Sequence, residues 1–148
     1  GNLNLDQSTP LSIKDLTKAF KTHKITKNLG ERDGPSFWYY NIGKLATAST
    51  VDTEANTPHQ LWIKDTSIPD QYGVTINMTF EELIEKRLNL YISTEHFHIY
   101  LYEKGSNIVY EMSLGDDYNG PDLWEYDFEH LKKYNSKITS MGWVIKNN

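Results

Sequence analysis

The chain has 148 residues, a formal net charge of −5 with a pI near 5.5, and no cysteine. This length favours one domain with a sizeable core, since a domain of about 150 residues buries roughly 70% of its unfolded surface. The lack of cysteine excludes disulfides, thiolate zinc sites and a cysteine nucleophile. No Lys/Arg stripe is present to suit a nucleic acid, and no apolar run reaches the ~20 residues of a membrane span.

The first part of the chain predicts one helix followed by strands. Residues 1–10 are polar and are expected to form a flexible tether. Ser12 followed by Asp15 resembles a capping box and predicts a helix over 12–21. The apolar residues that recur at helical spacing in this segment are Ile13, Leu16 and Phe20. Strands are predicted over 23–29, 36–42 and 59–65, and segment 44–58 is expected to begin as strand and end as loop.

The acid-rich stretch DTSIPDQYGVTINMTFEEL (65–83) is interpreted as scaffold rather than as a site of chemistry. Thr79 and Glu82 have the spacing of a capping box, which predicts a helix over 79–88. Asn77 is expected to take the left-handed turn that often precedes a helix. The predicted apolar stripe of this helix is Phe80, Leu83, Ile84 and Leu88.

A β-hairpin is predicted from the alternation in 96–104 and 107–114, with Gly105-Ser106 as a two-residue type II′ turn. This register places the apolar pairs on one face. The pairs are Leu101 with Tyr110, Ile99 with Met112, and Phe97 with Leu114.

The C-terminal part predicts a turn-rich loop, a helix and a last strand. The loop spans 115–127 and enters a helix near Asp122, and the strand covers 136–146. The predicted apolar stripe of this helix is Trp124, Phe128 and Leu131.

These elements predict an α+β fold, with two or three short α-helices packed on an antiparallel β-sheet, in a single domain over 11–148. Segments 12–26 and 79–93 share a cap, an acid and apolar positions at a constant offset (79 − 12 = 67). This similarity is open to two interpretations: two αβββ halves that arose by duplication, or chance convergence of two capping boxes.

Two sets of residues are candidates for ion binding. His96 and His98 point to one face of a strand, and Glu111 lies diagonally across the hairpin, so the three could ligate zinc. The alternative is the polar face of an antiparallel hairpin, because no further ligand is specified. The second set could hold calcium, or could simply form a turn and a helix cap. It comprises Asp116, Asp117, Asn119 and Asp122.

The loop that carries this second set, together with Tyr118, is a better candidate for a partner contact than for a metal site. No nucleophile motif, phosphate loop or positioned acid/base pair is visible in the sequence. We therefore expect no enzyme activity, no cofactor and no bound metal.

Three stretches carry a resemblance to a known family. They are STPLSIKDLTKAF, DTSIPDQYGVTINMTFEEL and YNGPDLWEYDFEHLKKYNSKITSMGWVIK. In order and spacing they resemble the YfeY-like family, bacterial envelope lipoproteins of a domain of unknown function that is described as regulated by the envelope-stress sigma factor. The chain departs from that family at Asn77, where a glycine is usual, and in having no cysteine pair after the middle helix.

The resemblance implies a bacterial envelope lipoprotein. From the acid-rich loop and the absence of catalytic motifs, we expect it to act as a non-catalytic accessory protein that binds another envelope protein through an exposed loop or sheet edge, with 115–122 as the first candidate. The resemblance also implies a location on the periplasmic side of the outer membrane, held by a lipid-modified cysteine upstream of Gly1. Two alternatives stay open: an immunity protein that neutralises a toxin, and a periplasmic protein that binds a small ligand or a metal. The sequence does not specify an oligomeric state.

Overall fold

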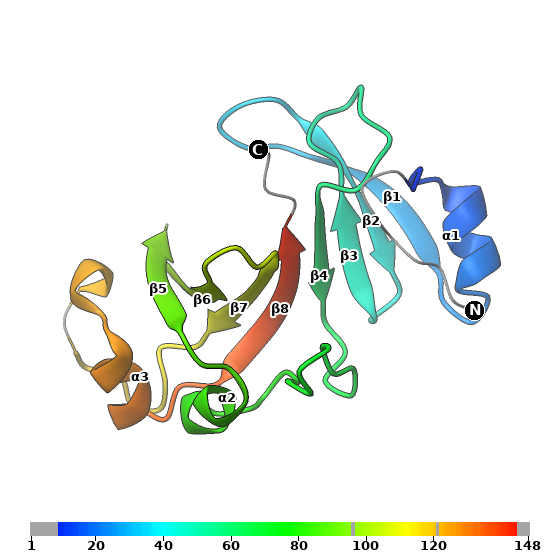
Figure 1. Cartoon of the computed structure of the whole chain (residues 1–148). Coiled ribbons are helices and arrows are strands. Elements are labelled where there is room, and N and C mark those ends of the chain that lie inside the picture. The colour runs from blue at the N-terminus through cyan, green and yellow to red at the C-terminus, as the bar shows by residue number, and fades with distance from the viewer. Residues whose placement is uncertain (1–8, 96, 121, 145–148) are drawn as a thin grey trace. The chain divides into compact units, whose positions relative to one another are not determined.

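The computed structural model describes residues 9–95, 97–120 and 122–144 (Figure 1). The chain divides into two compact units, Thr66–Gly142 and Gly1–Asp65 together with Trp143–Asn148. The predicted α+β class is confirmed, because short helices accompany antiparallel strands in the described residues. No helix in those ranges has both the length and the apolar character needed to cross a bilayer.

The first unit is a helix followed by a four-stranded meander, with strand order β1-β2-β3-β4 and antiparallel neighbours. Its elements are α1 (Ile13–Ala19), β1 (Ile25–Gly30), β2 (Phe37–Ile42), β3 (Ala46–Ser49) and β4 (Gln60–Ile63). All were expected near these positions. Segment 44–58 starts with β3 and continues as loop, as predicted.

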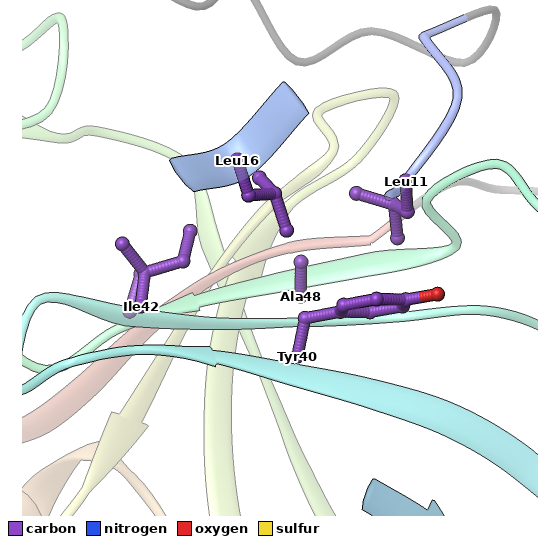
Figure 2. Packing of buried hydrophobic residues seen from close by; sticks show 6 residues of the cluster. Leu11, Leu16, Tyr40, Ile42 and Ala48 are labelled. Atoms are coloured by element: carbon purple, nitrogen blue, oxygen red, sulfur yellow. The ribbon is translucent and has the colours of Figure 1, made fainter. Parts of the chain in front are cut away.

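The core of this unit lies between α1 and the sheet. The Ser12 hydroxyl accepts a hydrogen bond from the backbone N–H of Asp15, so the predicted cap forms. Leu16 is buried against Ala48 and Ile42 (Figure 2). Ile13 was predicted to share this buried face, but its side chain is 47% exposed. The buried cluster consists of Leu11, Leu16, Tyr40, Ile42, Ala46 and Ala48.

The second unit repeats the order of a helix and sequential strands, and inserts a helix before its last strand. Its strands follow the order β5-β6-β7-β8. The first unit has four strands after its helix where the sequence predicted three, whereas the second unit has the three predicted strands between α2 and α3. The elements are α2 (Phe80–Lys86), β5 (Leu90–Glu95), β6 (His98–Glu103), β7 (Ile108–Met112), the 3-10 helix η1 (Leu123–Glu125), α3 (Phe128–Lys133) and β8 (Ile138–Val144).

The β6–β7 hairpin has the predicted register over its central pairs, Leu101 with Tyr110 and Ile99 with Met112, and all four side chains are buried. The prediction for Phe97 is wrong: it precedes β6, has a φ of +69° and is 92% exposed. The predicted two-residue turn is also displaced. The Ser106 N–H donates to the carbonyl of Glu103, and Gly105 takes the positive φ inside that turn.

Helix α2 begins as predicted but ends early. Thr79 and Glu82 form a complete capping box, and Asn77 before it has a φ of +76°. The predicted stripe is half wrong, because Ile84 is 39% exposed and Leu88 is 72% exposed. The helix stops at Lys86 with Arg87 as its C-cap, so residue 88 does not continue the helical face.

Helix α3 begins later than predicted, because its N-cap lies five residues beyond the predicted cap at Asp122. Asp127, and not Asp122, is the N-cap, with its carboxylate accepting from the N–H of His130. Asp122 precedes η1 and makes no side-chain cap. Leu131 is buried as predicted, but Trp124 lies on η1 and is 76% exposed.

A matched pair of substitutions tests the revised face of α2. Leu83→Ala removes a fully buried side chain, and we expect it to lower the free energy of unfolding by about 2–5 kcal/mol. Leu88→Ala should change it by less than about 0.5 kcal/mol, because this side chain is mostly in water. Urea denaturation at pH 7 gives both values. Equal losses for the two variants would contradict the placement of Leu88.

Candidate functional site

The segment between β7 and α3 presents a tryptophan among carboxylates. We define the acidic tryptophan patch as six exposed residues: Asp116, Asp117, Asn119, Asp122, Trp124 and Glu125. It contains four of the five residues predicted for partner binding, and Trp124 adds a large apolar surface that the sequence analysis assigned to the core. Residue 121 lies outside the described residues and forms no part of this patch.

Tyr118, the fifth predicted residue, supports the patch instead of belonging to its exposed surface. It is half-buried, with its ring centroid 5.0 Å from that of Tyr134 and 5.5 Å from that of Tyr126. Burial is the largest cause that raises the pKa of the Tyr118 hydroxyl. The ring of His130 contacts Tyr126 in a tilted arrangement at 5.2 Å and stacks with Tyr134 at 6.4 Å, so four aromatic rings join the loop to α3.

Hydrogen bonds hold the same loop at several points. The buried Tyr126 hydroxyl donates to the carbonyl of Leu114 over 2.7 Å, and the Tyr134 hydroxyl donates to the Asn119 side chain over 3.1 Å. The Asp116 N–H donates to the carbonyl of Tyr134. Gly115 is required beside this contact, because its φ is +96° and an added Cβ would lie 2.2 Å from the same carbonyl oxygen.

The charge of the patch is not neutralised by cations nearby. Within the described ranges, no lysine or arginine forms an ion pair with its four carboxylates. Asp116 accepts only a long hydrogen bond, 3.4 Å, from the Asn135 amide. The four carboxylates and Trp124 are therefore exposed on one segment, and Tyr118 joins that segment to the aromatic cluster.

The predicted zinc candidates come together only in part. His98 Nδ1 lies 2.5 Å from Glu111 Oε1, and the Ser140 hydroxyl donates to Glu111 Oε2 over 2.7 Å. His96 lies outside the described residues. In the described residues, no group of three or more His, Asp or Glu side chains is placed to hold a metal ion, and this includes the acids of the 115–122 loop.

The same cluster does not have the geometry of a catalytic triad. Glu111 lies between the serine hydroxyl and the imidazole, so His98 cannot take the proton of Ser140. Half-burial, followed by the charges of Glu111 and Glu95, raises the pKa of the neighbouring Tyr100. A protonated phenol in this position acts as a hydrogen-bonding group and not as a base.

The sequence analysis missed a buried arginine. Arg87 is 3% exposed, and its guanidinium donates to Glu103 over 2.7 Å and to the Tyr110 hydroxyl over 2.8 Å. The face of Tyr72 lies 3.8 Å from the guanidinium carbon. The position of Arg87, four residues after the buried Leu83, was the signal available in the sequence, since i and i+4 share a helical face.

The scaffold interpretation of the 65–83 stretch is confirmed for its central acid. Asp70 Oδ1 accepts the backbone N–H groups of Tyr72 and Val74, and Oδ2 accepts the hydroxyl of Tyr110. The carboxylate therefore ties the connection before α2 to strand β7, next to Arg87. Both of its oxygens therefore accept hydrogen bonds that fold the segment.

Comparison with known proteins identifies the fold. No family model and no curated protein matches the sequence. The crystal structure of the uncharacterized protein YfeY from Escherichia coli matches with a TM-score of 0.73 and 20% sequence identity, covering 95% of this chain and 93% of that chain. This chain has the YfeY fold. The resemblance seen in the sequence is thereby confirmed as a likeness of structure. The YfeY fold extends over both units, and at this identity the likeness concerns the fold alone.

Substitution of Tyr110 tests the buried network and its response to alkali. Burial, followed by the hydrogen bond and charge of Asp70, raises the pKa of Tyr110, although Arg87 opposes this. A raised folded-state pKa contributes stability that is fully present below about pH 10 and is lost as the pH rises through the folded pKa. Tyr110→Phe should cost about 1–3 kcal/mol at pH 7 and should flatten the decline of stability above pH 10.

Urea denaturation between pH 7 and pH 11 measures both effects. Tyr91→Phe is the matched control, because this ring is 50% exposed at the surface of β5. The control should keep the slope of the parent chain at high pH. A Tyr110→Phe variant with the parent slope would show that this phenol does not set the alkaline response.

Proposed function

We propose that this chain is a non-catalytic accessory protein of the bacterial cell envelope that binds another protein through the acidic tryptophan patch. The observation that carries the proposal is Trp124, which is 76% exposed on a segment whose four exposed carboxylates form no ion pair with a lysine or arginine among the described residues. An exposed tryptophan on a soluble surface is unfavourable in water and is the side chain most enriched in the energetic centres of protein interfaces.

The aromatic rings that pack against the loop favour a binding role for the patch. The aromatic cluster of Tyr118, Tyr126, His130 and Tyr134 holds the loop before any partner arrives. A loop that is already ordered loses little conformational entropy on association. Trp124 can then supply apolar burial at the centre of an interface, with the acids as its polar rim.

The chemistry of the patch defines the partner. Four carboxylates without cationic partners complement a surface rich in lysine or arginine that contains an apolar pocket for one indole ring. Association with such a surface should be faster at low salt, because exposed charges are screened over about 10 Å at 0.1 M ionic strength. The two alternatives, a toxin and a small ligand, are outcomes of the same experiment.

The proposed location rests on the sequence resemblance to envelope lipoproteins. In this proposal a lipid-modified cysteine upstream of Gly1 anchors the chain to the periplasmic side of the outer membrane. The tether predicted over 1–10 lies outside the described residues up to residue 8. Fractionation of cells that express the full-length gene tests the anchor. Recovery of the protein in the soluble periplasm would contradict it.

Site-specific crosslinking tests the partner. A photoreactive residue at Asn119 in the full-length protein should capture a discrete envelope protein in cells, whereas the same residue at Lys14 on α1 should not. With the captured protein purified, Trp124→Ala should weaken binding by roughly 30-fold or more, the effect expected of an interface centre worth at least 2 kcal/mol. Asp117→Asn should reduce the dependence of binding on salt.

The matched control for affinity is Ile13→Ala, which removes an apolar side chain that is 47% exposed on the first unit. It should bind the partner with unchanged affinity. If Trp124→Ala binds equally well, the patch is not the interface. Capture of a single secreted toxin would instead assign the chain to the immunity class.

A further inference from the structure

The chain contains a single Asn-Gly step, Asn119-Gly120, which lies in the loop between β7 and η1. The side chain of Asn119 is exposed, and residues 113–120 form neither helix nor strand. A glycine after an asparagine has no Cβ to hinder the approach of its backbone nitrogen to the asparagine side chain. Attack by that nitrogen on the side-chain amide is the first step of spontaneous deamidation.

Close packing accounts for the glycine at position 120. A Cβ added to Gly120 would lie 2.8 Å from Cε2 of Tyr118 and 3.2 Å from the hydroxyl oxygen of Tyr134. A larger residue would therefore have to displace one of the rings that join the loop to α3. The packing that favours glycine at this position also leaves an unhindered backbone nitrogen next to Asn119.

The attacking nitrogen is free of competing hydrogen bonds. Among the residues that the structure describes, the N–H of Gly120 donates to no acceptor. Asn135 is also exposed, but it precedes Ser136, which is fully buried and whose N–H donates to the carbonyl of Leu131 over 2.9 Å. The two exposed asparagines therefore differ in the group that must attack.

A hydrogen-bond donor already lies at the atom on which negative charge would develop. The hydroxyl of Tyr134 donates to Oδ1 of Asn119 over 3.1 Å, and Tyr134 is buried. Attack on the amide carbon moves electron density onto Oδ1. A fixed donor at that oxygen stabilises the tetrahedral intermediate and lowers the barrier to its formation.

We propose that Asn119 is a site of spontaneous deamidation, assisted by the hydroxyl of Tyr134. The nitrogen of Gly120 forms a bond to Cγ of Asn119, the Cγ–Nδ2 bond breaks, and ammonia leaves with the proton of the former Gly120 N–H. Water then opens the cyclic imide. Hydrolysis at Cγ gives an aspartate at position 119, and hydrolysis at the backbone carbonyl gives an isoaspartate, in which the main chain runs through Cβ and Cγ.

Either product adds a carboxylate to the four of the acidic tryptophan patch and makes the net charge of −5 more negative by one unit. The isoaspartate also lengthens the main chain beside Tyr118 and Tyr134. For the partner proposed above, the aspartate form should associate faster at low salt. This consequence rests on the proposed function, whereas the deamidation itself does not.

Incubation of the purified chain at slightly alkaline pH, followed by peptic digestion in acid and mass spectrometry, tests the proposal. Fragmentation that separates isoaspartate from aspartate should find both at position 119, because direct hydrolysis of the amide gives aspartate alone. Loss of the amide at Asn135 should be about tenfold or more slower, since the N–H of Ser136 would first have to leave its hydrogen bond. Asn119→Gln should keep its amide, because attack on the longer side chain needs a larger ring.

Tyr134→Phe keeps the ring and removes the donor. It should slow the deamidation of Asn119 about threefold or more in the folded chain, the effect of one lost hydrogen bond. It should leave the rate unchanged in urea, where neither chain is folded. The matched control is Tyr126→Phe, which removes a buried hydroxyl that donates to Leu114 in the same cluster and should keep the parent rate. Circular dichroism shows whether each variant folds.

Absence of deamidation at position 119 in the folded chain overturns the proposal, as does aspartate without isoaspartate. An unchanged or faster rate in Tyr134→Phe, or equal slowing by Tyr126→Phe, overturns the role of the Tyr134 hydroxyl. The readout needs no partner, so it is separate from the proposed function. A chain that deamidates as expected but whose partner binding ignores Trp124 would refute only the proposed function.

Discussion

The second unit depends on a single buried charge, the guanidinium of Arg87. A buried cation without partners is strongly unfavourable, because the loss of hydration is not compensated. Here Glu103, Tyr110 and Tyr72 compensate it from two strands and from the connection before α2, and Asp70 holds Tyr110 in turn. The unit must bring these segments together to satisfy the charge, so the network specifies their relative positions as well as their contacts.

The acidic residues of the chain include two kinds, those that hydrogen-bond within the fold and those that are exposed without an ion pair. Asp70 and Glu82 use their oxygens to fold the segment that contains them, one at a turn and one at a helix cap. The four exposed carboxylates of the acidic tryptophan patch share a segment with an exposed indole and form no ion pair with a lysine or arginine among the described residues. Because only the second group has capacity left for recognition, it is the better basis for a functional proposal than the acid-rich stretch that stands out in the sequence.

Three apolar side chains assigned by pattern to the core lie in water instead: Leu88, Phe97 and Trp124. They follow a helix end, occupy a left-handed turn position and sit on a 3-10 turn, so none continues the periodicity of a neighbouring element. Departures from local pattern are expected where a surface serves binding. In this chain one of the three, Trp124, belongs to the acidic tryptophan patch, the surface to which we assign a protein partner.

Local chemistry in the sequence was enough to place the caps at Ser12 and Thr79, the central register of the β6–β7 hairpin and the α+β class, because each depends on groups a few residues apart. It also located the 115–122 loop and four residues of the patch. The spacing of Arg87 from Leu83 indicates a shared helical face, but the partners of Arg87 and the support of that loop by Tyr134 could not be read from the sequence, because both need contacts between segments distant along the chain. Periodicity shows that one face of an element is apolar, and tertiary packing decides where that face ends and which side chains beyond it meet water.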